Sequence, residues 1–140
     1  MSSLFLDISA ALDKNLNDMA GKPDGIAWPN AEFTPTDGSL WVRPTVIMAD
    51  TAGGTLGASV QGMYSGFYQI DVFAPAGEGK GEAYAMADLI ADQFKRGTQL
   101  AYNSRTIECM QSTYLAARND GAWFVIPLQI DFYSLTTERT

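Results

Sequence analysis

The segment that most clearly indicates the fold is WFVIPLQIDFYSL, residues 123–135. Its apolar side chains recur at a period of two, which is the spacing of a β-strand with one buried face. The side chains expected on that face are those of Phe124, Ile126, Leu128, Ile130 and Phe132. The sequence therefore predicts a long strand that packs one side against a core.

Further strands are predicted on the N-terminal side of this segment. Asn119-Asp120-Gly121 is a hairpin turn signal that leads into the last strand. Pro44 interrupts the hydrogen-bonding ladder of an earlier strand and indicates an edge position or a bulge. The other predicted strands cover residues 39–48, 64–73, 99–102, 105–110 and 113–118.

Two amphipathic helices are predicted, over residues 4–20 and 81–96. Apolar residues recur at spacings of three and four in both segments, and glycines at positions 21 and 97 follow them. The order is thus helix, strands, helix, strands. We expect an α+β fold in one domain, residues 1–140, built as a two-layer sandwich. Its sheet is expected to be mostly antiparallel or mixed, with both helices packed on one face.

Composition excludes several classes of function. Nine basic residues stand against sixteen acidic ones, for a net charge of −7, so binding to DNA, RNA or an anionic membrane is disfavoured. The absence of histidine removes the commonest general base and metal ligand. The single cysteine, Cys109, is expected to be a small buried hydrophobe in a strand. We therefore expect a protein that is not an enzyme and holds no cofactor.

Carboxylates and glycines offer weak alternatives. Asp71 and Asp131 lie in the matching triplets Gln-Ile-Asp and would form a weak divalent-metal site if their strands brought them together. A sheet face turned to solvent or to an interface is the preferred interpretation. The glycine-rich residues 50–62 lie between predicted strands and indicate a hairpin loop. Residues 77–81 open a helix, but Glu78 would repel a phosphate, so we expect no nucleotide site.

Aromatic residues are more informative. Trp123 and Tyr133 share the parity opposite to the apolar face of the last strand. Large aromatic side chains there indicate that the second face of the sheet is covered. The cover is expected to be residues 25–35, which contain Trp28, Pro29 and Phe33, or another subunit.

The chain resembles the tail terminator (tail completion) proteins of long-tailed bacteriophages. The resemblance rests on the N-terminal helix 8–19, on residues 26–30 (IAWPN) with 33–35 (FTP), and on 40–43 (LWVR). It continues through residues 66–75 (GFYQIDVFAP), a glycine-rich turn with the second helix, residues 94–97 (FKRG) and the final strand.

The resemblance implies a hexameric ring that closes the tail tube, stops tube polymerisation and presents a surface to the head. The implied partners are other copies of the chain, the tail tube protein and a head–tail connector protein. The implied location is the head-proximal end of the tail in the virion, after synthesis in the host cytoplasm. The expected interface residues are Asp50, Gly53, Gly54, Thr55, Leu56, Gly57, Trp28, Pro29, Asn30, Phe33, Trp123 and Tyr133.

Three alternatives stay open at the level of sequence. The first is another neck or tail component, either a head–tail connector or a tail tube subunit. The second is a small metal-dependent enzyme that uses Asp71 and Asp131. The third is a ligand-binding module built on the aromatic residues around Trp28 and Trp41.

Overall fold

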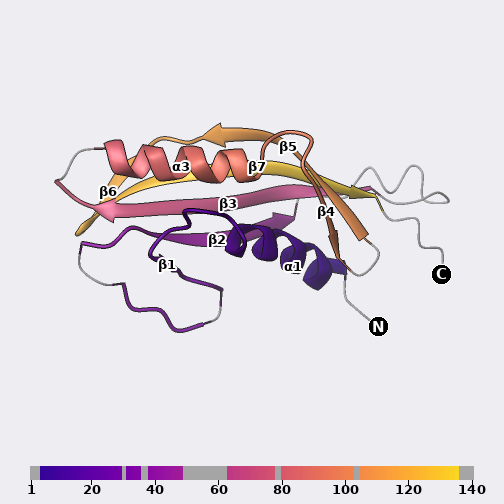
Figure 1. Cartoon of the computed structure of the whole chain (residues 1–140), viewed down its shortest axis with the longest axis horizontal. Helices are drawn as coiled ribbons and strands as arrows, with labels where there is room; N and C mark the ends of the chain where they lie inside the picture. The colour runs from indigo at the N-terminus through magenta and orange to yellow at the C-terminus, as the bar shows by residue number, and fades with distance from the viewer. Residues whose placement is uncertain are drawn as a thin grey trace.

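The computed structural model describes residues 4–29, 31–35, 38–48, 63–77, 80–102 and 105–135. Figure 1 shows how the elements are arranged. In chain order they are α1 (Leu4–Asn17), β1 (Gly25–Ile26), β2 (Trp41–Met48), β3 (Met63–Pro75), α3 (Gly81–Gln93), β4 (Gln99–Tyr102), β5 (Arg105–Tyr114), β6 (Arg118–Asp120) and β7 (Trp123–Leu135).

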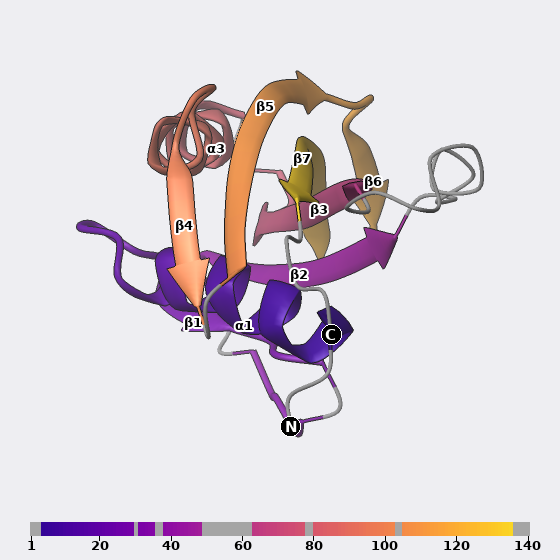
Figure 2. The same ribbon diagram turned by 90° about the vertical axis from the view of Figure 1, so that its right-hand side faces the viewer.

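All the strands belong to one sheet in the order β1-β2-β3-β7-β5-β4, and β6 pairs with β7 beside β5. β1 and β2 run parallel, whereas every other pair is antiparallel. Figure 2 shows that the sheet curls strongly, so that β5 and β4 run across the direction of β2. The α+β class is confirmed, and the sheet is mixed. A two-layer sandwich is not confirmed, because the sheet curls around the helices.

The main core lies between both helices and one face of the sheet. Ile8, Leu12 and Leu16 of α1 are fully buried there, and so are Ala83, Ala87 and Ile90 of α3. β3 and β7 contribute their even-numbered residues, namely Tyr68, Ile70, Val72, Ala74, Ile126, Leu128, Ile130 and Phe132, and β5 contributes Ile107 and Cys109. The period of two in residues 123–135 is therefore confirmed, and β7 has the predicted bounds.

Two predicted boundaries are wrong in an informative way. The predicted strand 105–110 continues without a break to Tyr114 as β5, whose register with β7 shifts between Cys109 and Ser112. The predicted strand 113–118 is wrong, because only its first two residues belong to β5 and Arg118 begins β6. An extra residue in one strand raises the local twist, so this irregularity contributes to the curl. Both helices also end about one turn early, at Asn17 and Gln93.

Pro44 marks an edge. β2 keeps a regular register with β3 from Trp41 to Met48, so Pro44 causes no bulge. On its other side β2 pairs with β1 only at Trp41 and Val42. Among the described residues, no strand continues this pairing beyond Val42, and the rest of that side of β2 borders a groove.

Candidate interaction groove

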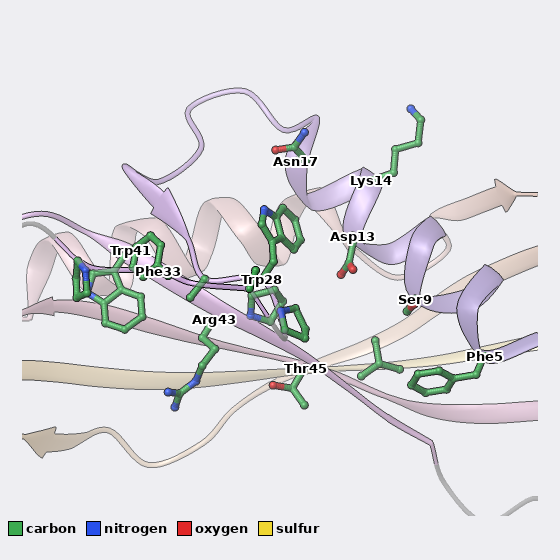
Figure 3. Close-up of a pocket in the computed structure, with 16 residues that line it drawn as sticks. Phe5, Ser9, Asp13, Lys14, Asn17, Trp28, Phe33, Trp41, Arg43 and Thr45 are labelled. Atoms are coloured by element: carbon green, nitrogen blue, oxygen red, sulfur yellow. The ribbon is translucent and has the colours of Figure 1, made fainter.

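The groove lies between α1 and the outer edge of β2, and residues 27–29 and 31–35 close one end of it (Figure 3). Its volume is 1030 Å³. α1 contributes Phe5, Ser9, Asp13, Lys14 and Asn17, and the 27–35 segment contributes Ala27, Trp28, Pro29, Ala31, Phe33 and Pro35. β2 contributes Trp41, Arg43, Pro44, Thr45 and Val46.

An aromatic cluster anchors the closed end. Trp41 stacks on Phe73 with ring centroids 3.9 Å apart, while Phe33 and Trp123 pack against the same indole at 5.1 and 5.5 Å. The Trp41 Nε1–H is buried and has no acceptor among the described residues. Gly25 makes room for this arrangement, because a Cβ there would lie 2.8 Å from the Phe33 ring. The cluster holds Ala27 and Phe33 against the second face of the sheet.

Asp13 is the acidic residue among the described groove lining. The hydroxyl of Tyr68, which is fully buried in the core, donates a 2.6 Å hydrogen bond to Asp13 Oδ1. Burial raises the pKa of the Asp13 carboxyl above 3.8, and the Tyr68 hydrogen bond opposes that shift. Burial and the neighbouring carboxylate also raise the pKa of Tyr68, so its proton stays on the phenol. The pair therefore holds one oriented carboxylate beside the groove.

The two basic side chains of the groove lining already have acidic partners. Lys14 Nζ lies 2.8 Å from Asp18 Oδ2 on the exposed face of α1. Arg43 lies 3.4 Å from Asp71 Oδ2, and its guanidinium stands 5.0 Å above the Phe73 ring centroid. In Figure 3 the Lys14 and Arg43 side chains point in opposite directions away from Asp13. Asp13 is thus the acidic residue of the groove lining without a basic partner among the described residues.

The predicted interface residues fall into three groups. Trp28, Pro29 and Phe33 line the groove. Trp123 belongs to the aromatic cluster, where Ala27 and Phe33 cover this part of the sheet. This agrees with the first of the two predicted covers, residues 25–35. Tyr133 lies elsewhere on β7, where its hydroxyl donates to Glu108 Oε1 at 3.2 Å. Asn30, Asp50, Gly53, Gly54, Thr55, Leu56 and Gly57 lie outside the described residues, as does the predicted loop 50–62.

The carboxylates of the weak metal hypothesis are not brought together. β3 and β7 are neighbours, but the register places Asp71 opposite Pro127 and Asp131 opposite Phe67. The two triplets meet at their glutamines, where Gln129 Nε2 donates to Gln69 Oε1 at 3.2 Å, and then run apart. Asp71 is buried against Arg43 and Gln69 instead. Among the described residues, no group of three His, Cys, Asp or Glu side chains could hold a metal ion.

Sequence reasoning missed two features of the groove. The first is Asp13, which borders the apolar stripe of α1 between Leu12 and Leu16, where nothing in the pattern separates it from a solvated residue. The second is the open side of β2. Pro44 indicated either an edge position or a bulge, and the sequence did not decide between them. No described helix is both long enough and apolar enough to span a membrane.

Comparisons with known proteins agree with this fold. One solved chain matches over 99% of this chain and 100% of its own length, with a TM-score of 0.77 and 20% identity. A chain from the virion of a native gene transfer agent particle matches over 97% and 100%, with a TM-score of 0.68 and 17% identity. No curated protein sequence matches the chain.

The family described as phage tail terminator protein matches residues 7–132, which span α1 and nearly all of the sheet. Proteins of this family are structural proteins of the phage. The chain belongs to the phage tail terminator family and is a structural protein of the bacteriophage tail.

Proposed function

We propose that this protein caps the tail tube as a hexameric ring, ends tube polymerisation and forms the surface that joins the tail to the head. The observation that carries the proposal is the family match over residues 7–132. The proposed partners are other copies of the chain, the tail tube protein and a head–tail connector protein. The proposed location is the head-proximal end of the tail, after synthesis in the host cytoplasm.

The sheet supports a ring physically. A closed ring needs head-to-tail contacts between two different surfaces of each subunit. The described sheet ends in two unlike strands, β2 beyond its short pairing with β1, and β4 at the opposite end of the strand order. We propose that the whole chain, residues 1–140, acts as one domain in this ring without catalytic activity or cofactor, and without binding specific nucleic acid sequences or membranes.

The predicted interface residues remain part of this proposal. Contacts with neighbouring subunits or the tube are proposed for Trp28, Pro29 and Phe33 at the groove, and for Asn30, Asp50, Gly53, Gly54, Thr55, Leu56 and Gly57. Trp123 and Tyr133 are proposed to support contacts on the second face of the sheet. Alanine variants of the exposed members of this set are expected to fold normally and to enter tails poorly.

The decisive experiment removes the protein from the phage. Particles that lack it should carry tails of uncontrolled length that do not join heads, and a plasmid copy should restore uniform tails. Normal, joined tails in its absence would remove the proposal. Electron microscopy of the purified protein is the second measurement, because long self-assembled tubes would identify a tube subunit and not a terminator.

A further inference from the structure

We infer that the groove between α1 and β2 binds an extended segment of another virion protein, which adds to the sheet as a strand beside β2 and places a basic side chain at Asp13. The inference rests on the proposed function only in placing its partner in the phage tail. The argument has three parts: the backbone of β2, the walls of the groove and its charge.

The backbone of β2 offers unused hydrogen-bonding groups. The Asp24 N–H donates to the Leu40 carbonyl and the Ala27 N–H donates to the Val42 carbonyl, so the even-numbered residues direct their backbone groups away from β3. Alternation along the strand then turns the same side of Pro44, Val46 and Met48 outward. Among the described residues none pairs with β2 there. A strand added at this edge would form main-chain hydrogen bonds with β2, whose backbone is already held in place by its pairing with β3.

The walls fit an extended chain. Phe5 of α1 and Trp28 provide apolar surface (Figure 3), and Pro29 and Pro35 also line the groove. When an extended peptide binds between a helix and an exposed strand edge, its hydrogen bonds to the strand backbone supply affinity. The walls of the groove then contact every second side chain of the peptide. β1 already occupies the start of this path, parallel to β2, and it ends at Ile26. The added segment would continue the line of β1 along β2.

Charge selects a basic partner. Lys14 and Arg43 are held by Asp18 and Asp71, whereas the partner of Asp13 within the described part of the chain is the neutral Tyr68 hydroxyl. The chain also carries a net charge of −7, which attracts basic segments at a distance. A second copy of the chain fits poorly. It carries the same net charge of −7, and two arginines of its described strands, Arg43 and Arg105, are held by Asp71 and Asp7.

Photo-crosslinking in assembled tails tests the inference directly. A phage without the protein is complemented with a copy that carries p-benzoylphenylalanine at Thr45, an exposed residue of the groove lining. The control copy carries it at Gln111, an exposed residue of β5. We expect Thr45 adducts with one segment of another virion protein that contains Lys or Arg, identified by mass spectrometry. Adducts only with a second copy, no adduct, or the same adducts at Gln111 would overturn the inference.

A matched pair of variants tests the backbone pairing. Val46→Pro removes the outward N–H but leaves the bonds between β2 and β3, whereas Val46→Thr keeps the N–H and a similar shape. We expect the Thr45 crosslink to fall at least tenfold with Val46→Pro and to persist with Val46→Thr. Equal yields from the two variants would refute strand addition. Thermal melting of both proteins checks that they fold.

Asp13→Asn provides an independent arm should Val46→Pro fail to fold. Asparagine still accepts the Tyr68 hydrogen bond but carries no charge. The crosslink should weaken by about fivefold at low salt, the effect expected for one partly exposed charge pair, and should lose much of its salt dependence. An unchanged yield would refute the role of charge. If the copy without either substitution gives no Thr45 adduct in tails of normal length, the inference alone is overturned, whereas normal, joined tails without the protein would overturn the proposed function.

Discussion

Replacing Gly66 with alanine should destabilise the protein strongly. Gly66 lies in β3 between Met48 of β2 and Phe132 of β7. A Cβ at this position would collide with the Ile47 carbonyl oxygen and would lie 3.1 Å from both Met48 Cα and Phe132 Cζ. Two of these three neighbours are backbone atoms of the strand that borders the groove. The steric conflict therefore falls on β2, which cannot relieve it by changing a rotamer.

The size of the effect follows from what has to move. Phe132 is 1% exposed and packed in the core, so its ring has little free space. Extra methyl groups in a packed core typically cost about 1–3 kcal/mol, and displacing backbone puts this substitution at the upper end, at about 3 kcal/mol. Domains of this size are stable by only about 5–15 kcal/mol, so the loss is a large fraction of the total.

Urea denaturation measures the effect, since the midpoint shifts with stability while the slope reports the surface exposed on unfolding. Gly81→Ala is the matched control. A Cβ at Gly81 meets nothing within 4 Å, and Gly81 opens α3, so alanine there should be neutral or stabilising by up to about 1 kcal/mol. If Gly66→Ala unfolds at the same urea concentration as wild type, the reasoning about the approach of β2 to β3 is refuted.

Three further outcomes are expected. Folding raises the pKa of Asp13 above 3.8, so the protonated carboxyl stabilises the fold below pH 3.8 and this contribution is lost as pH rises through the folded pKa. Asp13→Asn should therefore be more stable than wild type at pH 7 and show no such advantage at pH 3. Urea titrations at both pH values will decide this. Arg105→Ala should lose about 3 kcal/mol or more, because the Arg105 Nε bond of 2.8 Å to Asp7, a residue 1% exposed, disappears and leaves a buried carboxylate; a midpoint near wild type in the same assay would contradict this. Burial raises the pKa of Cys109 to about 11, so the native thiol should resist a disulfide reagent at pH 8 and react once urea unfolds the chain, whereas rapid reaction of the native protein would show that β5 opens.

Sequence patterns predicted the parts of the fold whose period is simple. Residues 123–135 alternate cleanly, because one face of β7 is buried against the helices along most of its length. The alternation of apolar residues failed to predict strand bounds where pairing with a neighbouring strand, and not burial of one face, determines the backbone. In β5 the residues between Cys109 and Ser112 suggested a break, but the strand continues through a register shift that its pairing with β7 stabilises. Local composition cannot show such pairing.

The candidate site was predicted only in part for a similar reason. Trp28, Pro29 and Phe33 could be singled out because aromatic and proline residues are conspicuous in an irregular segment. Asp13 could not, since its significance depends on Tyr68, which lies 55 positions away and reaches it only in the folded sheet. The curl of the sheet places α1 beside the edge of β2. Alternation of apolar residues predicts strands but does not predict this curl.

The edge of β2 is selective because of its sequence. An open strand edge normally pairs with any available strand, and proteins prevent this with prolines, charges and short accessible stretches. β2 has all three features: Pro44 offers no N–H on the outward side, Arg43 flanks it, and α1 stands beside the remaining positions. Among the described residues, Val46 and Met48 retain both outward backbone groups, too few to hold an arbitrary strand. The proposed partner must therefore add contacts with the aromatic wall and with Asp13, and these contacts would make the edge selective for one segment.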